Sequence, residues 1–166
     1  MQFNHATMDI SNTDTPTVTD NNERRHSIRP CHETDYPSIV ALWERSVRAT
    51  HEFLTEDDIL EIKSKLASEY FPAVDIHILD VDGKPGGFIG MAGNKIEMLF
   101  VDSFCQGKGC GTALLDFAIG KGAKLVDVNE QNPAALGFYR SKGFRSVGRT
   151  PTDDAGRPFP ILHLSL

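Results

Sequence analysis

LFVDSFCQGKGCG occupies residues 99–111, and the helix-forming stretch TALLDFAIG follows directly at residues 112–120. An apolar strand thus leads into a glycine-rich loop, and a helix leaves the loop. The start of a helix offers unpaired backbone N–H groups and the positive end of the helix dipole. Glycines let a phosphorylated ligand approach those donors closely, and no proline between Phe104 and Gln131 removes an N–H. The stretch therefore predicts a cradle for a diphosphate group.

Three kinds of diphosphate-binding loop compete for this stretch. A P-loop requires G-x-x-x-x-G-K-[ST], whereas Lys108 precedes the second glycine of the loop. A Rossmann fingerprint requires G-x-G-x-x-G and an acidic residue about 20 positions later at the end of a second strand, and the chain offers neither. The remaining pattern is Q/R-x-x-G-x-G/A, which Gln106, Gly109 and Gly111 match.

The bulk properties indicate one soluble domain preceded by a tail. The 166 residues are 40% hydrophobic and carry a net charge of −6, which is ordinary for a chain that buries a core. Residues 1–25 are rich in Thr, Asn and Asp and have almost no periodic apolar pattern, so we expect a disordered tail ahead of a domain at residues 26–166. No basic stripe suggests a nucleic-acid partner. No apolar run approaches the roughly 18 residues of a membrane span.

The cysteines indicate a reducing compartment. Cys31, Cys105 and Cys110 contain no C-x-x-C pair, so no metal site is expected. Their odd number, together with a start that lacks the features of a signal or transit peptide, predicts a cytoplasmic protein.

Periodicity predicts the element order β-α-α-β-β-β-α-β-α-β-β. The strands are expected at residues 27–30, 75–79, 86–91, 95–101, 125–129 and 144–149 and, after a turn-rich excursion at 150–160, around Leu162, Leu164 and Leu166. Thr34 is expected to cap the first helix, and Thr55–Asp58 reads as a capping box for the second. The glycine-rich loop opens the third helix. The fourth helix is expected at residues 133–141.

This order predicts the fold class. The strand–loop–helix–strand segment favours a parallel pair at the centre of the sheet. Asp82-Gly83 and Gly93-Asn94 are hairpin signals, which favour antiparallel pairing for the other strands. We therefore expect an α/β (α+β) fold, in which helices cover both faces of a mixed central sheet.

The loop and a second segment together resemble the GCN5-related N-acetyltransferase (GNAT) superfamily. The second segment is DVNEQNPAALGFY at residues 127–139, followed by Gly143-Phe144, and it is similar to the strand and helix that follow the loop in that superfamily. The resemblance covers roughly residues 27–166 and implies the GNAT-type acyl-CoA N-acyltransferase fold. WERSVRATH at residues 43–51 and the stretch at 152–160 resemble the YjaB-type bacterial branch more narrowly.

The chain departs from the commoner family pattern at three positions near the loop. Ser103 stands where many members have proline, Cys105 where many have an aromatic residue, and Gln106 where arginine is commoner. Glutamine is an accepted alternative at that last position, so the departures leave cofactor binding intact.

The resemblance implies acetyl-CoA as co-substrate. The pyrophosphate would be held by the backbone N–H groups of the loop and the first helical turn, which are Gln106, Gly107, Lys108, Gly109, Cys110, Gly111 and Thr112. The pantetheine arm would lie beside Leu99, Phe100 and Val101 like an additional strand, and an N–H of that strand would stabilise the oxyanion. For the loop taken alone, a glycine turn that merely closes a helix stays an alternative.

Two residues are candidates for proton transfer. The family resemblance places Tyr139 near the sulfur, where a phenol with a pKa of about 10 can protonate the departing thiolate. The alternative is a core tyrosine that packs on Phe138 and Phe144. Glu97 is the candidate base, because a carboxylate can take a proton from the incoming amine directly or through water. Its alternative role is that of a strand residue paired with Lys95.

Other polar residues have weaker assignments. Asn132 either caps the helix that begins at Pro133 or binds the pantetheine arm. The family resemblance places a possible acceptor pocket near Arg48, His51, Glu52, Asp153 and Asp154. Cys105 and Cys110 are interpreted as small packing residues, since no histidine partner is evident.

The resemblance thus implies an acetyl-CoA-dependent N-acetyltransferase. It would move the acetyl group to a primary amine by direct attack in a ternary complex. The acceptor is expected to be an amine-bearing small molecule, a protein lysine or a protein N-terminus, and the enzyme a monomer or homodimer. One alternative hypothesis is a non-catalytic acyl-CoA-binding or sensing module. Another, disfavoured by the missing P-loop spacing, is a nucleotide-binding regulator or kinase-like protein.

Overall fold

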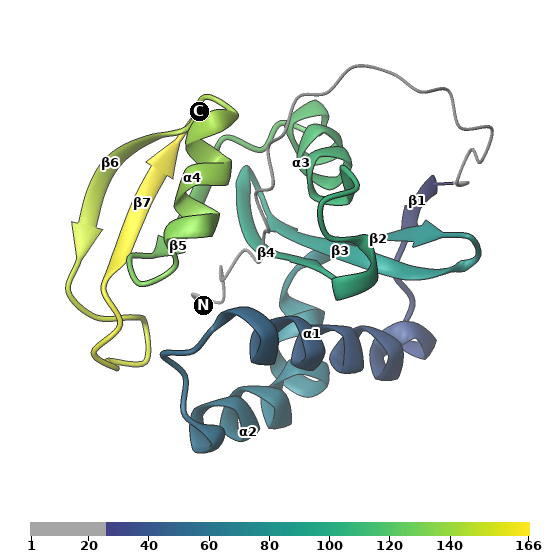
Figure 1. Ribbon diagram of the computed structural model, residues 1–166, viewed down its shortest axis with the longest axis horizontal. Helices are drawn as coiled ribbons and strands as arrows, with labels where there is room; N and C mark the ends of the chain where they lie inside the picture. The colour runs from purple at the N-terminus through teal and green to yellow at the C-terminus, as the bar shows by residue number, and fades with distance from the viewer. Residues whose placement is uncertain (1–25) are drawn as a thin grey trace.

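The computed structural model describes residues 26–166, which form one seven-stranded sheet with helices on both faces (Figure 1). The strand order is β1-β2-β3-β4-β5-β7-β6. All neighbouring strands are antiparallel except β4 and β5, which are parallel. The predicted mixed sheet with a parallel central pair is confirmed. The disordered tail expected at residues 1–25 lies outside the described residues.

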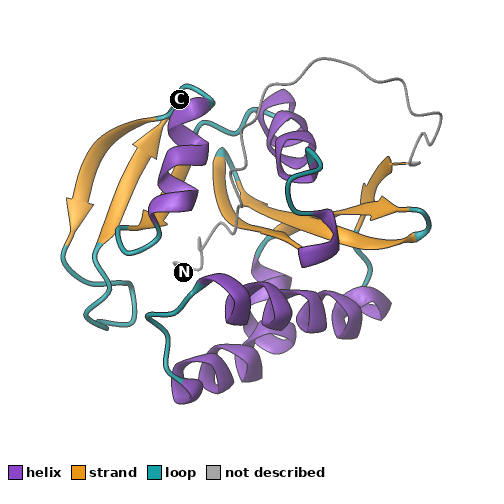
Figure 2. Ribbon diagram, viewed as in Figure 1, coloured by secondary structure: helices purple, strands orange, loops and turns teal. Residues whose placement is uncertain are grey.

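The elements follow the predicted order (Figure 2). The strands are β1 (His26–Pro30), β2 (Asp75–Val81), β3 (Lys84–Ala92), β4 (Lys95–Val101), β5 (Leu125–Asn129), β6 (Arg145–Thr150) and β7 (Ile161–Ser165). The α-helices are α1 (Tyr36–Thr50), α2 (Glu56–Lys65), α3 (Cys110–Gly120) and α4 (Pro133–Ser141). Short helical turns that the sequence pattern did not predict are η1 (Glu33–Asp35), η2 (Leu66–Tyr70), η3 (Phe71–Ala73) and η4 (Ser103–Cys105).

The start of α2 confirms the predicted capping box. The Thr55 hydroxyl accepts a hydrogen bond from the Asp58 N–H at 3.2 Å, and the Asp58 carboxylate accepts one from the Thr55 N–H at 2.9 Å. Two otherwise unpaired donors at the helix start are therefore satisfied locally, so the sequence alone fixes where α2 begins.

The predicted cap of the first helix is wrong. Asp35, not Thr34, is the N-cap residue of α1, and the turn η1 precedes it. The Asp35 carboxylate accepts from the His32 N–H at 2.8 Å and from the Arg29 guanidinium at 2.9 Å. The ion pair with Arg29 of β1 thus helps to place Asp35 at the helix start. The residues around Thr34 do not indicate this ion pair.

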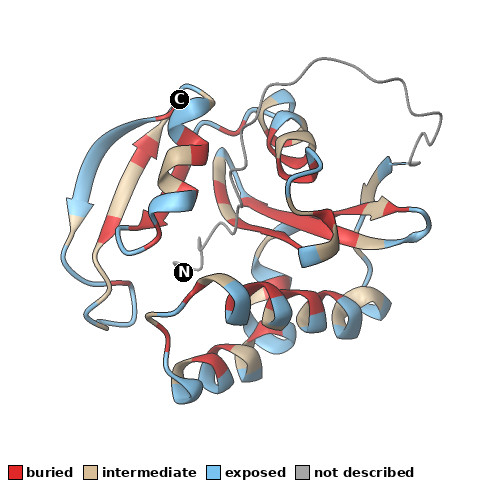
Figure 3. Cartoon of the chain, in the orientation of Figure 1, coloured by how far each residue is buried: buried red, intermediate tan, exposed pale blue. Residues whose placement is uncertain are grey.

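Two apolar layers pack on opposite faces of the sheet, and the central strands are buried between them (Figure 3). The layer beneath α1 and α2 includes Trp43, Phe88 and Phe100, which are at most 1% exposed. The layer beneath α3 and α4 includes Leu114 and Val126, both fully buried. In contrast, residues 145–149 of β6, at the sheet edge, are exposed.

The strand β4 departs from regular pairing where it meets the site. Gly90 of β3 lies opposite Met98 and Met91 lies opposite Ile96, so Glu97 is the extra residue of a β-bulge. On its other side, β4 pairs with β5 only at its first two residues, after which the two strands separate (Figure 1). Among the described residues, the β5-facing edge of residues 97–101 therefore has no strand partner.

Candidate active site

The glycine-rich loop forms a tight bend at the end of β4. Gly107 and Gly109 have left-handed backbones with φ of 69° and 79°, a conformation that favours glycine. Gly109 is the N-cap residue of α3, and within residues 26–166 no side chain caps this helix. A Cβ atom at Gly109 would meet nothing within 4 Å. The loop therefore presents the start of α3 to open space, as a diphosphate cradle requires.

Gln106 adds a side-chain donor to this loop. Its Nε2 atom is buried, and no residue of the range 26–166 accepts a hydrogen bond from it. An unpaired buried amide is costly unless a ligand or water completes its hydrogen bonds. This orphaned donor fits the binding of a coenzyme phosphate, and the predicted contacts from Gln106 to Thr112 stay predictions.

The strand β4 supplies the second part of the coenzyme site. Leu99, Phe100 and Val101 are all buried, with side chains alternating between the two apolar layers. Their backbone edge toward β5 has no strand partner among the described residues. An extended amide-bearing arm can add to such an edge as a strand would. The observed separation of β4 and β5 therefore fits the pantetheine arm.

Tyr139 is fully buried in the layer beneath α4. Its ring makes edge-to-face contacts with Phe138 at 5.2 Å and with Phe144 at 5.4 Å, so the packing interpretation is correct. Its hydroxyl is nevertheless buried without a hydrogen-bond partner in the described chain. Burial raises the pKa of this phenol far above its ordinary value, so it stays protonated and can act as a proton donor.

Glu97 is also largely buried, with a side chain that is 12% exposed. Its Oε1 atom lies 3.9 Å from the Lys95 ammonium, and its Oε2 atom is buried with no partner within residues 26–166. Burial raises the pKa of Glu97, while Lys95 opposes this shift. A carboxylate with a raised pKa and one open oxygen has the properties of a general base.

Asn132 performs the capping role. Its Oδ1 atom accepts a hydrogen bond from the Ala135 N–H at 3.1 Å, at the start of α4. Pro133 occupies the first helical position, as predicted. Contact between Asn132 and the pantetheine arm stays a prediction.

Most of the predicted acceptor residues have structural partners. Arg48 pairs with Glu44 and Glu56, on the exposed side of α1 and α2. Asp153 is buried and binds Arg157 through the side chain at 2.7 Å and through the backbone N–H at 2.8 Å. The Arg157 contacts of Asp153 shape the loop between β6 and β7. An acceptor contact of Arg48 or Asp153 stays a prediction.

His51 differs from the solvated histidine that a connector usually carries. It is 2% exposed, and its Nδ1 atom lies 2.8 Å from the Thr50 hydroxyl. Next to it, Phe53 makes an edge-to-face contact with Phe159 at 5.7 Å. The connector between α1 and α2 therefore meets the loop between β6 and β7. The family resemblance assigns the acceptor pocket to these two segments; Glu52 and Asp154 stay candidates there.

The two cysteines beside the loop are packing residues, as interpreted from the sequence. Cys105 and Cys110 are each 1% exposed and belong to the apolar layer beneath α3. Burial raises the pKa of the Cys105 thiol to about 12, so it is not a thiolate at neutral pH.

Comparison with known proteins identifies the family. The sequence profile of the acetyltransferase (GNAT) domain matches residues 52–160, more than half of the chain. The chain is also 36% identical over 140 residues to the peptidyl-lysine N-acetyltransferase YjaB of Salmonella typhimurium, a match that covers 83% of this chain and 96% of the relative. The chain belongs to the GNAT acetyltransferase family. The predicted acetyl-CoA-dependent N-acetyltransferase is thereby confirmed, and acetyl-CoA is its co-substrate.

Other GNAT proteins agree with this assignment. YjaB of Escherichia coli is 36% identical over 141 residues, covering 84% of this chain and 95% of the relative. The solution structure of its apo form matches with a TM-score of 0.78 at 34% identity and covers 85% of this chain and 97% of that one. The PaiA N-acetyltransferase of Thermoplasma acidophilum, solved in complex with coenzyme A, has a TM-score of 0.66 at 20% identity and shows the fold alone.

Sequence reasoning missed two residues beside Glu97. Asp127 of β5 and His163 of β7 lie on the same face of the sheet as Lys95. Asp127 forms hydrogen bonds with Lys95 and with His163. The signal was present in LVDVN at residues 125–129, because its central Asp127 is a buried acid between two apolar residues. A buried carboxylate in a strand normally implies a charged partner.

Among the described helices, none is long and apolar enough to cross a membrane.

Proposed function

We propose that this GNAT enzyme acetylates lysine side chains of proteins by direct attack in a ternary complex. The observation that carries the proposal is the match to the two YjaB proteins, which are named peptidyl-lysine N-acetyltransferases and are matched over almost their whole length. The buried orphan atoms Glu97 Oε2 and Tyr139 Oη support it, since both belong to residues with proton-transfer chemistry.

The proposed reaction uses the two residues in sequence. Glu97 accepts a proton from the incoming lysine ammonium, directly or through water, and leaves a neutral amine that can attack. The new N–C bond forms as the C–S bond breaks, and Tyr139 gives its proton to the departing thiolate. The amide nitrogen loses its second proton, which restores Tyr139 through solvent. Overall, one proton is released for each acetyl group transferred.

The charge around Glu97 supports a cationic acceptor. Asp127 and Asp154 both act on Glu97 as negative charges, and within residues 26–166 Lys95 is the positive charge that acts against them. A site with more carboxylates than ammonium groups attracts a lysine before it is deprotonated. The net charge of −6 likewise favours a cationic protein segment over a nucleic acid.

A thiol-release assay with matched peptides tests the acceptor. The enzyme and acetyl-CoA are incubated with an N-terminally blocked peptide that contains one lysine, with the same peptide carrying arginine instead, and with a panel of small amines. We expect coenzyme A release and an acetylated product only with the lysine peptide. Release with small amines alone would contradict a protein acceptor, and binding of acetyl-CoA without release by any amine would favour a sensing module.

We also propose that the enzyme works in the cytoplasm, as a monomer or homodimer. No disulfide links Cys31, Cys105 and Cys110, which fits a reducing compartment. Cell fractionation and size-exclusion chromatography with light scattering test the location and the assembly.

A further inference from the structure

Polar and charged side chains connect three strands at the point where β4 and β5 begin to separate. The Lys95 ammonium donates a hydrogen bond to Asp127 Oδ2 at 2.7 Å and lies 3.9 Å from Glu97 Oε1. Asp127 Oδ1 lies 2.7 Å from the Nδ1 atom of His163. The contacts thus run from Glu97 through Lys95 and Asp127 to His163, from β4 to β5 and β7.

The strand register places these side chains on one face. Lys95 lies opposite Leu125 in the parallel pair, and Asp127 lies opposite His163 in the antiparallel pair. Side chains two residues apart in a strand share a face, so Lys95, Asp127 and His163 all lie on the face that α1 and α2 cover further along the sheet. The bulge at Glu97 adds its carboxylate to the same group.

The network is sufficiently buried for each charge to affect the others. The side chains of Glu97 and Asp127 are 12% and 6% exposed, compared with 28% for Lys95. Water screens such charges only partly. Lys95 is 1.2 Å closer to Asp127 than to Glu97 (3.9 − 2.7 Å), so Asp127 holds the ammonium away from Glu97.

We propose that Lys95 and Asp127 are positioning residues that set the basicity of the Glu97 carboxylate in opposite directions. The inference rests on the proposed role of Glu97 as the base. Lys95 stabilises the ionised form of Glu97. Asp127 draws Lys95 away and adds a negative charge, which disfavours that ionised form. His163 holds the second oxygen of Asp127 and so fixes where its charge lies.

The influences of these residues on the pKa of Glu97 have the signs that the proposal requires. Burial raises the pKa of Glu97, Lys95 lowers it, and Asp127 and Asp154 raise it further. Burial lowers the pKa of Lys95, but the hydrogen bond to Asp127 and the negative charges of Asp127, Glu97 and Asp154 together outweigh burial, so the pKa is raised. Lys95 therefore stays a cation throughout the range in which Glu97 titrates.

Carboxyl titration by ¹³C NMR tests the proposal without turnover. Glutamate-labelled protein is titrated as wild type, Lys95→Met and Asp127→Asn, and the Glu97 signal is assigned by its loss in Glu97→Gln. We expect the Glu97 midpoint to rise in Lys95→Met and to fall in Asp127→Asn. Lys95→Arg keeps the charge and should restore a midpoint near that of the wild type.

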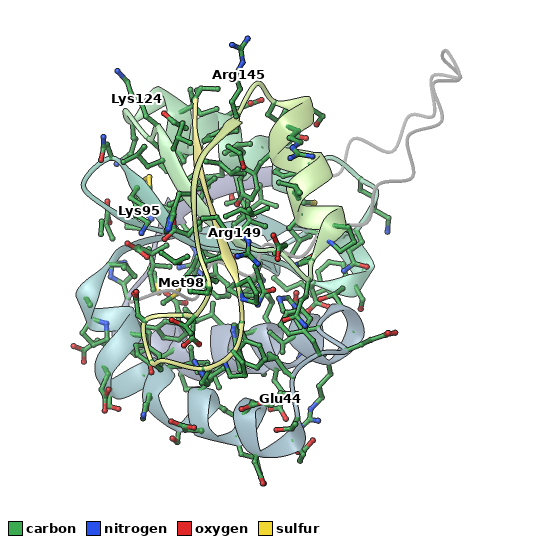
Figure 4. All side chains as sticks on the ribbon, turned by 90° about the vertical axis from the view of Figure 1, so that its left-hand side faces the viewer. Glu44, Lys95, Met98, Lys124, Arg145 and Arg149 are labelled. Carbon is green, nitrogen blue, oxygen red and sulfur yellow. The ribbon has the colours of Figure 1, made fainter. Side chains whose placement is uncertain are left out.

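A matched lysine provides the control. Lys124 is exposed and, as Figure 4 shows, points out from the edge of the molecule, away from Lys95. Lys124→Met should leave the midpoint unchanged. Midpoints that move in the same direction in Lys95→Met and Asp127→Asn, or that do not move, would overturn the network. Undiminished turnover of Glu97→Gln would instead overturn the role of Glu97 as base, so the two failures are distinguishable.

Discussion

One face of the sheet changes character between β4 and β5. Across β2, β3 and β4 this face is apolar, and Ile78, Phe88 and Phe100 on it are fully buried beneath α1 and α2. Across β5 and β7 the same face carries Asp127 and His163, which bond to each other. The first region serves packing, whereas the second holds charge.

The difference explains why a base can work at the boundary. Glu97 lies on β4, beside the apolar region, and burial there raises the pKa of its carboxyl. Lys95 links the same carboxylate to Asp127 in the polar region. The apolar region therefore supplies a low dielectric and the polar region supplies the charges, and neither alone would tune a glutamate for proton transfer.

The sharpest contrast between the two regions is in stability. Phe100→Ala should reduce the free energy of unfolding by about 3–5 kcal/mol, because it leaves a cavity beneath α1. His163→Ala in the polar region should cost much less, since the His163 side chain is 30% exposed. Urea unfolding of both variants measures the difference. Equal losses would contradict the division into a packing region and a charge region.

Tyr139→Phe should affect the chemistry and leave binding almost unchanged. Removing a general acid is expected to lower kcat about a hundredfold, because the thiolate then leaves unprotonated. The ring contacts with Phe138 and Phe144 remain, so the Kd for acetyl-CoA and the Tm should stay near the wild-type values. Steady-state kinetics and calorimetry separate the effects.

Tyr36→Phe is the matched control for this variant, since Tyr36 packs on Phe71 at the start of α1. A normal kcat in Tyr139→Phe would remove Tyr139 from the mechanism and leave it only a packing role.

Gly109→Ala should weaken acetyl-CoA binding, with a smaller fold-change than that expected for the kcat of Tyr139→Phe. A left-handed backbone costs a residue with a Cβ atom roughly 1–2 kcal/mol, so the loop should shift from its binding conformation and raise Kd about 5–30-fold. Space is not the cause, because a Cβ atom at Gly109 meets nothing within 4 Å. Gly120 is the matched control, because it lies at the end of the same helix, has nothing within 4 Å of a Cβ atom and has no positive φ. Gly120→Ala should bind acetyl-CoA normally. Equal affinity in both variants would mean that the cradle does not depend on this bend.

The smallest expected effect is a pH-dependent change in stability. The pKa of Glu97 is raised in the folded protein, so its contribution to stability is present below the ordinary pKa of glutamate and is lost as pH rises through the raised value. Glu97→Gln does not titrate. The Tm of the variant should therefore increase relative to that of the wild type as pH rises through this window. Thermal scans at a series of pH values measure this difference in Tm. A difference that shrinks as pH rises would contradict burial as the dominant influence on the pKa of Glu97.

The sequence predicted the fold better than the details of the site. β4, β5 and α4 have the predicted bounds, because alternation, turn residues and a proline at the first helical position are local signals. The cap of α1 was missed because Asp35 is held by Arg29, which belongs to β1. The bulge at Glu97 was also missed. It depends on the register between β3 and β4, which the residues of β4 do not reveal.

The network around Glu97 was partly predictable. The possible pairing of Glu97 with Lys95 follows from their spacing on one strand, and the pair is present at 3.9 Å. The contact of Lys95 with Asp127 could not be predicted in the same way, because these residues are 32 positions apart and meet only through the parallel pairing of β4 and β5. The candidate acceptor residues Arg48 and Asp153 also have charged partners, but these lie close by in the sequence: Glu56 is eight positions from Arg48, and Arg157 is four positions from Asp153.

The most direct test of the account is the pH dependence of kcat/KM for wild type and Glu97→Gln, with acetyl-CoA and a lysine peptide. The wild-type rate should rise with pH along a limb that lies above the ordinary pKa of glutamate, because the base works only when ionised. Glu97→Gln should lose that limb and fall in rate by about 10²–10⁴-fold. A variant that keeps both the limb and the wild-type rate would contradict a base at the boundary between the two regions.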